Sequence, residues 1–177
     1  MKLARPIVIT GFMGCGKTEV ARALARRLHL EAIDLDDKIA TQHGRTAAEL
    51  IVAEGEAAFR AIETSTLREL LNRSTANVIA LGGGAWIGNE NRALIAAHEG
   101  VAVLLDTPFE VCWQRIKASA QDRPLGRTRA QAEQLYHQRR PIYQLAHIHV
   151  AVMDHDDSLE KIVARIEAAL ANYRDAK

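Results

Sequence analysis

The chain has 177 residues, of which 48% are hydrophobic and 25% are charged, and its formal net charge is +1. This length predicts a single domain with a full hydrophobic core, and the near-zero charge gives no general attraction to nucleic acid or to an anionic membrane. No apolar run approaches the ~20 residues of a spanning helix, and we expect no signal peptide because an apolar strand follows Met1 closely. The two cysteines lack the spacing of a metal site or a disulfide framework, so we expect a cytoplasmic protein.

The first predicted elements are a strand over Ile7–Thr10, a glycine-rich loop and a helix. The loop reads Gly-Phe-Met-Gly-Cys-Gly-Lys-Thr over residues 11–18, which matches the pattern G-x-x-x-x-G-K-[ST]. The backbone N–H groups of such a loop and the N-terminus of the next helix point at one place, where they bind phosphate. Lys17 would contact the β- and γ-phosphates, and Thr18 would ligate Mg²⁺. The sequence therefore predicts a site for a nucleoside triphosphate.

Four further apolar runs predict strands, at Ala32–Ile33, Val78–Leu81, Val101–Leu105 and Ile148–Val152. The run at 101–105 does not alternate, which is typical of a strand buried on both faces of a parallel sheet. Helical patterns fill the gaps between the runs, so we expect an α/β fold with a central parallel sheet. In such folds ligands bind beyond the carboxyl ends of the strands.

Helical periodicity is clearest in four segments, Glu54–Leu71, Glu90–His98, Phe109–Ala118 and Ser158–Ala171. Ser158 is a candidate cap for the last of them. Residues 119–129 are polar, rich in arginine and without periodicity, so we expect a mobile loop there.

Two carboxylates follow the second strand as Asp34-Leu35-Asp36. Residues two apart on a strand point to the same side, so both could face the phosphate loop. One would hold the water shell of Mg²⁺, and the other would contact an acceptor hydroxyl as a hydrogen-bond acceptor or general base. Capping of the following helix is an equally good interpretation for either of them. Asp37 has the position of a first-turn helix residue.

Two features of the middle of the chain have both a structural and a functional interpretation. Arg60 and Glu63 lie three apart on the long helix and share a face, which on its own is better explained as a surface ion pair worth ~0.3 kcal/mol. The run Gly82-Gly83-Gly84 follows the third strand and would let a ligand approach the backbone closely. A plain tight turn is the alternative, although three consecutive glycines cost chain entropy, which favours function.

Three arginines outside the loop are candidates for contacts with a ligand. Arg123 could neutralise the transferred phosphoryl group, although a solvated charge is the better interpretation on composition alone. Arg139 precedes Pro141, which we expect to end a helix, and a guanidinium at such a terminus suits a carboxylate. Arg115 could stack on an adenine face or lie exposed on its helix.

Taken together, these segments resemble the shikimate kinase family over nearly the whole chain. The motifs that carry the resemblance are residues 11–18, Asp34-Leu35-Asp36, Glu56-x-x-Phe59-Arg60, residues 82–84, Arg123-Pro124-Leu125 and Arg139-x-Pro141-x-Tyr143. The resemblance implies ATP-dependent phosphorylation of the 3-hydroxyl of shikimate, on the route to chorismate and the aromatic amino acids. It also implies a three-layer P-loop kinase fold of one domain over 1–177, with strand order 2-3-1-4-5, a substrate-binding region at 35–63, a lid at 114–128 and a monomeric state.

The resemblance implies a role for each site residue. Lys17, Asp36 and Arg123 are the expected catalytic residues, with Asp36 as the candidate base. ATP is expected at Gly14, Cys15, Gly16, Lys17, Thr18, Glu19, Arg115 and Arg123, Mg²⁺ at Thr18 and Asp34, and shikimate at Asp36, Arg60, Gly82, Gly83, Gly84 and Arg139. Gly126 stands where the family usually has leucine, and the lid is about one residue longer than usual.

Two other functions are compatible with the residues. A P-loop kinase for a different small acceptor, such as gluconate or a nucleoside monophosphate, would carry the same phosphate loop. A nucleotide-binding switch fits less well, because the chain has no Asn-Lys-x-Asp guanine signature and no glutamate follows Asp106 to activate water.

Overall fold

The apolar runs of the sequence form the strands of one parallel sheet in the computed structural model of the chain. The structure describes residues 5–73, 77–119, 128–152 and 157–175. The strands are β1 (Ile7–Thr10), β2 (Glu31–Asp34), β3 (Asn77–Ala80), β4 (Val101–Asp106) and β5 (Ile148–Ala151). Their order is β2-β3-β1-β4-β5 and every pair is parallel, which confirms the fold that the resemblance implies.

The central strand β1 is buried along its whole length. Ile7 pairs with Val78 on one side and with Val101 on the other, so the carboxyl ends of the three strands meet at one edge of the sheet. Helices cover both faces at this point, which explains why the apolar runs do not alternate. The edge strand β5 does alternate between buried and exposed residues, as a strand with one covered face should.

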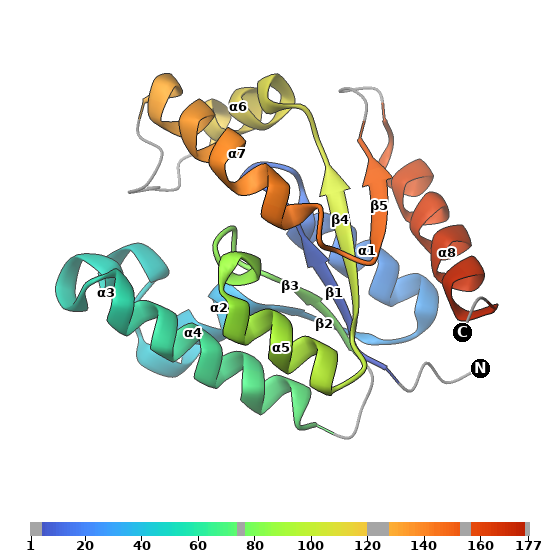
Figure 1. Ribbon diagram of the computed structural model, residues 1–177, viewed down its shortest axis with the longest axis horizontal. Helices are drawn as coiled ribbons and strands as arrows, with labels where there is room; N and C mark the ends of the chain where they lie inside the picture. The colour runs from blue at the N-terminus through green and yellow to red at the C-terminus, as the bar shows by residue number, and fades with distance from the viewer. Residues whose placement is uncertain (1–4, 74–76, 120–127, 153–156, 176–177) are drawn as a thin grey trace.

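Helices flank the sheet on both faces and at its carboxyl end. In the described ranges they are α1 (Lys17–Leu28), α2 (Leu35–His43), α3 (Ala47–Glu54), α4 (Glu56–Leu71), α5 (Asn89–Ala97), α6 (Phe109–Ala118), α7 (Arg129–Tyr143), α8 (Leu159–Asp175) and the 3-10 turn η1 (Ala85–Ile87). Helix α1 packs with α8 and α4 packs with α5, while α6 and α7 lie at the end to which the strand arrowheads point (Figure 1). Within these ranges no helix has the length and the apolar character needed to cross a membrane.

The helix expected over Glu54–Leu71 is confirmed as α4, which begins two residues later, at Glu56. Helix α3 ends at Glu54 and α4 begins at Glu56, because Gly55 has a φ of 89°, a conformation that side chains disfavour. The helix expected after Asp34 is α2, whereas the sequence pattern does not predict α3, which buries a narrow face. Leu50 is the buried residue of α3, so its periodic signal is weak.

Pro141 lies inside α7, so the expected helix stop at this proline is wrong. The helix continues to Tyr143, and Gln144 N donates to Arg140 O at 3.1 Å. A proline removes one N–H donor from a helix, yet α7 continues for two residues beyond Pro141. As a consequence, Arg139 and Tyr143 are four residues apart on one helical face.

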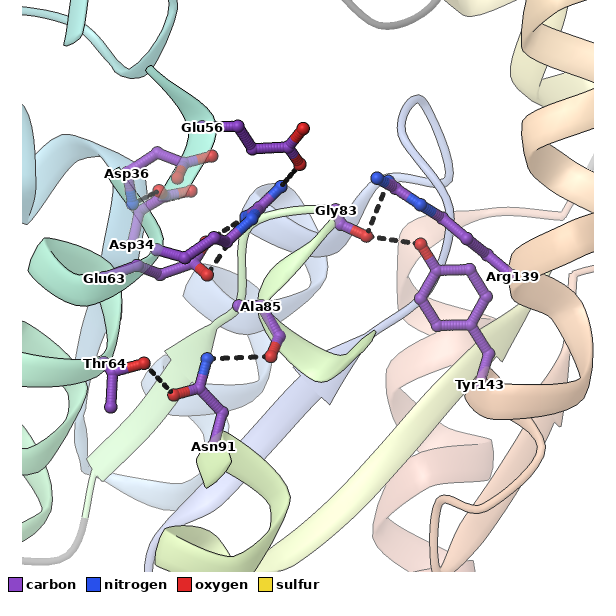
Figure 2. A network of polar contacts seen from close by, with 11 residues as sticks. Asp34, Asp36, Glu56, Glu63, Thr64, Gly83, Ala85, Asn91, Arg139 and Tyr143 are labelled. Carbon is purple, nitrogen blue, oxygen red and sulfur yellow. Dashed lines mark hydrogen bonds and ion pairs between the residues drawn. The ribbon is translucent and has the colours of Figure 1, made fainter. Parts of the chain in front are cut away.

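A buried amide holds the segment that follows β3 in place. Asn91 is 2% exposed, and its Nδ2 donates to Ala85 O at 2.9 Å while its Oδ1 accepts from Thr64 Oγ1 at 2.8 Å (Figure 2). This side chain joins α4, α5 and η1 directly behind residues 82–84. The position of the glycine run therefore depends on Asn91.

Asn91→Ala should lower the free energy of unfolding by about 1–3 kcal/mol, because the buried carbonyl of Ala85 and the half-buried hydroxyl of Thr64 lose their partner. Urea denaturation followed by circular dichroism measures the change. Asn89→Ala is the matched control: Asn89 is exposed and accepts a 3.3 Å bond from Arg92, so its loss should stay within about 0.5 kcal/mol. Equal losses in the two variants would contradict the role of Asn91.

Candidate active site

The glycine-rich loop joins β1 to α1 as expected. Gly11, Gly14 and Gly16 have φ values of 143°, 79° and 94°, which side chains rarely adopt. A Cβ at Gly14 would also lie 2.6 Å from the carbonyl oxygen of Cys112 on α6. Gly14 therefore fixes both the shape of the loop and its packing against α6, although the motif itself leaves this position open.

Two cationic side chains contact the carbonyl groups of the loop. Lys17 Nζ donates to Gly11 O at 2.9 Å and to Phe12 O at 3.0 Å. Arg115 reaches the loop from α6, and its Nη1 donates to Cys15 O at 3.3 Å. The loop thus carries the positive charge that a triphosphate requires. Arg115 lies at the phosphate loop, and its contact with adenine stays a prediction.

The remaining loop residues lie at the same end of α1. Gly16 is its N-cap, and Glu19 is exposed in its first turn. A Cβ at Gly16 would lie 3.6 Å from Arg115 Nη1 and 3.8 Å from Glu19 Oε2. The structure therefore brings residues 14–19 and Arg115 together around one helix N-terminus, where the helix dipole favours an anion.

Asp34 contacts the loop and also begins a helix. Its Oδ2 accepts from Thr18 Oγ1 at 2.6 Å, and its Oδ1 accepts from the backbone N–H of Asp36 at 2.9 Å and of Asp37 at 3.2 Å. Asp34 is thus the N-cap of α2. The capping interpretation and the position beside Thr18 both hold for the same carboxylate.

Asp36 reaches the site by a different route from the one expected. Strand β2 ends at Asp34, so Asp36 lies in the first turn of α2, and the argument from strand alternation is wrong. Its carboxylate instead lies against the glycine run, because a Cβ at Gly82 would be 2.7 Å from Asp36 Oδ1. Asp37 is an exposed first-turn residue, as expected.

A cleft of about 770 Å³ collects the side chains that were expected to bind an acid. Asp36, Arg60, residues 82–84 and Arg139 all line it, and Met13 of the phosphate loop forms part of the wall. The remaining lining residues come mainly from α2, α3 and the start of α4, namely Asp37, Ala40, Thr46, Ala47, Ala48, Glu49, Ile51, Val52, Phe59 and Glu63. Loop and cleft therefore adjoin.

Arg60 forms an ion pair with a buried carboxylate. Its Nη1 donates to both oxygens of Glu63, at 2.9 and 3.0 Å, and its Nη2 donates to Glu56 at 3.2 Å. The Glu63 side chain is 1% exposed, so the interpretation of this pair as a surface ion pair is wrong. Burial on α4 makes Glu63 a fixed support for the guanidinium, which faces the cleft.

The glycine run passes between the two cleft arginines. A Cβ at Gly84 would lie 2.6 Å from the guanidinium carbon of Arg60. On the other side, Arg139 Nη1 donates to Gly83 O at 3.3 Å, and Tyr143 Oη donates to the same oxygen (Figure 2). The run also forms a turn, with Ala85 N donating to Gly82 O at 3.0 Å. Gly82 and Gly84 are needed because a side chain there would occupy the space of Asp36 and Arg60, respectively.

Electrostatics link the phosphate loop to the cleft. Burial raises the pKa of Asp36 and the neighbouring Asp34 raises it further, whereas Lys17 and Arg60 lower it. One cation of the loop and one of the cleft thus act on the same carboxyl group. Burial also raises the pKa of Glu63 to about 7, against the opposing effect of Arg60.

Two side chains at the site have no role assigned from the sequence: Glu63, which lines the cleft, and Tyr143, which bonds to the glycine run behind it. The sequence pattern predicts Glu63 as a surface residue, and it includes Tyr143 only as a position in the motif Arg139-x-Pro141-x-Tyr143. The four-residue spacing of Arg139 and Tyr143 is a signal for a shared helical face, but the expected helix stop at Pro141 hides it.

Arg123 and most of the expected lid lie outside the described residues. Of residues 114–128, the structure describes 114–119 and 128. The roles of Arg123 and of Gly126 therefore stay predictions.

Comparisons with known proteins agree on one family. A family model described as shikimate kinase matches residues 13–171. The shikimate kinase of Ruegeria pomeroyi is 38% identical over 176 residues, which cover 98% of this chain and 88% of that protein. The shikimate kinase of Thermobifida fusca is 38% identical over 171 residues, which cover 94% of this chain and 98% of that protein.

Solved structures agree with this result. A shikimate kinase from Acinetobacter baumannii in complex with shikimate has a TM-score of 0.85 at 32% identity and covers 99% of this chain and 97% of that one. A gluconokinase from Sinorhizobium meliloti has a TM-score of 0.68 at 18% identity, covering 97% and 94%, which shows a common fold alone. Since sequence identity above 30% extends over nearly the full length, this chain belongs to the shikimate kinase family, whose members use ATP as co-substrate.

Proposed function

We propose that this chain transfers the γ-phosphoryl group of ATP to the 3-hydroxyl of shikimate. The observation that carries the proposal is the cleft in which two arginines and a carboxylate adjoin a phosphate-binding loop. A compact polyhydroxylated acid needs cations for its carboxylate and an anion for its hydroxyl groups. The family relatives, one of them solved in complex with shikimate, support this substrate.

The acid would bind between the two guanidinium groups of the cleft. Arg60 and Arg139 line opposite sides of the glycine run, and a guanidinium can offer a carboxylate two parallel donors. Glu63 and Glu56 would hold Arg60 in place during binding. The acid's ring would lie against Gly83 and Gly84, next to the Arg60 guanidinium that contacts Gly84.

Transfer would take place where the cleft meets the loop. Lys17, which contacts loop carbonyls in this structure, would donate to the β- and γ-phosphates. Asp36 would accept a hydrogen bond from the 3-hydroxyl and take up its proton, and its raised pKa makes it a better base than an ordinary aspartate. Arg123 would neutralise charge on the migrating group.

The residues near Thr18 fit Mg²⁺. A hydroxyl and a carboxylate lie 2.6 Å apart, and Mg²⁺ takes oxygen ligands, including phosphate oxygens and waters. Thr18 and Asp34 would hold it, and when bound it would neutralise charge on the phosphates.

We further propose a substrate-binding region at 35–63, a lid at 114–128, a single domain, and a monomer that acts in the cytoplasm.

A coupled assay of ADP release across candidate acceptors tests the proposed function. Turnover should depend on shikimate and should be absent with gluconate or AMP. The reason is that the cleft offers two arginines to the carboxylate of the acid and the carboxylate of Asp36 to its hydroxyl group. Lys17→Ala, purified in the same way, should abolish turnover and excludes a contaminating kinase. Release of ADP that is indifferent to any acceptor would instead favour a nucleotide-binding switch.

Arg60→Ala should raise the KM for shikimate about 30-fold or more and leave the KM for ATP within about threefold. The reason is that loss of one partner from a desolvated charge pair costs about 2–5 kcal/mol. Initial-rate kinetics with each substrate varied in turn give both constants. Arg68→Ala on the same helix is the control, since Arg68 is exposed and pairs with Glu90 at 2.9 Å. If Arg60→Ala raised both KM values equally, the carboxylate contact would be misassigned.

Glu63→Gln should remove part of the pH dependence of stability. Glu63 ionises near pH 7 in the folded chain and near 4.5 in the unfolded chain, so the folded state binds more protons between these values. Its contribution is therefore fully present below about pH 4.5 and is lost as the pH rises through 7.

A shift of this size corresponds to about 3 kcal/mol. From pH 5 to pH 8, the wild type should lose about 2.5 kcal/mol of unfolding free energy relative to Glu63→Gln, as measured by urea denaturation at each pH. Asp36 titrates in both proteins, and because its charge also acts on Glu63, the difference between them includes this coupling. A constant difference between the two proteins across this range would rule out the raised pKa.

A further inference from the structure

The carbonyl oxygen of Gly83 accepts hydrogen bonds from two side chains at once. Arg139 Nη1 donates to it at 3.3 Å, and Tyr143 Oη donates to it as well (Figure 2). A carbonyl oxygen has two lone pairs, so both bonds can form together. Both donors come from the last turns of α7, and they differ in how firmly they are held.

Tyr143 is fixed by its surroundings. It is 3% exposed and belongs to the core, and the neighbouring turn of α7 is tied to η1 by a bond of 3.0 Å from Trp86 Nε1 to Ile142 O. Burial raises the pKa of the Tyr143 phenol well above its usual value, so the hydroxyl keeps its proton and remains a donor. The bond from Tyr143 to Gly83 is therefore a permanent part of the structure.

Arg139 is placed differently. It is partly exposed and lines the cleft, whereas Tyr143 does not. Its guanidinium can turn toward an anion in the cleft, but only by weakening or giving up the bond to Gly83 O. Leaving a partly buried carbonyl without a donor opposes such a movement. Because Tyr143 also donates to this oxygen, the movement leaves no unpaired group.

We propose that Tyr143 is a positioning residue for the acid: it keeps the Gly83 carbonyl paired and thereby frees Arg139 to bind the acid's carboxylate. The inference rests on the proposed function and extends it to a residue without contact to the acid. In the absence of the phenol hydroxyl, Arg139 is the remaining donor to Gly83 O among the described residues, and acid binding has to break that bond.

Tyr143→Phe removes the hydroxyl and keeps the ring in the core. The KM for shikimate should rise about 5- to 100-fold, the factor that an unpaired interior acceptor would cause. The KM for ATP and kcat should stay within about twofold, because neither depends on the state of Arg139 before the acid binds.

Tyr136→Phe is the matched control on the same helix. Tyr136 is also buried, and its hydroxyl donates to a backbone carbonyl, Thr107 O, at 3.0 Å. Its loss should lower stability to a similar degree in urea denaturation and leave the KM for shikimate unchanged. A rise in that KM in both variants would show a general loss of rigidity and overturn the proposal.

Arg139→Ala separates positioning from simple support of the glycine run. If Tyr143 acts through Arg139, adding Tyr143→Phe to Arg139→Ala should not raise the KM for shikimate further. If the two substitutions together raised the KM by the product of their separate factors, Tyr143 would support the backbone independently of Arg139, and the proposal would be wrong.

A second measurement uses the wild-type protein and therefore does not depend on whether a variant folds. In nitrogen-15 spectra of arginine side chains, shikimate should shift the Arg139 guanidinium signals, while the Tyr143 hydroxyl proton remains protected from exchange. Loss of that protection on binding would overturn the proposal. A wild type that turns over no shikimate would refute the proposed function itself, whereas normal turnover with an unchanged KM in Tyr143→Phe would refute this inference alone.

Discussion

The parallel pairing of β1 with β3 and β4 is the constraint on which the site depends. The register of this pairing brings the carboxyl ends of three strands to one level, so the segments that follow them meet in space. The phosphate loop follows β1 and the glycine run follows β3. The two segments therefore lie side by side, and Met13 of the loop forms part of the wall of the cleft that the glycine run lines.

Charge is the second common element of the site. Cations at the loop and in the cleft surround two carboxyl groups, Asp36 and Glu63, that burial alone would keep neutral. Because Lys17 and Arg60 both act on Asp36, a change of charge in one half of the site is felt in the other. The binding of two anionic substrates side by side becomes feasible only with this density of positive charge.

Much of the fold could be predicted from the sequence, because unbroken apolar runs identify buried parallel strands without further information. The phosphate loop could also be predicted, because its motif specifies a particular backbone conformation. Other features depend on tertiary contacts that no local pattern contains. Glu63 looks like a surface residue until the packing around α4 is known, and Pro141 looks like a helix stop although α7 continues two residues past it. Asp36 was assigned to the right place by an argument that assumed a longer strand.

The carboxylate of Asp34 performs two tasks with its two oxygens, because one meets Thr18 and the other receives the first N–H groups of α2. Any replacement at this position alters the start of a helix together with the chemistry beside the loop. Asparagine could keep the cap while losing the charge, and alanine would lose both. The helix start and the surroundings of Thr18 thus stand or fall with one side chain, and few amino acids can satisfy both demands during evolution.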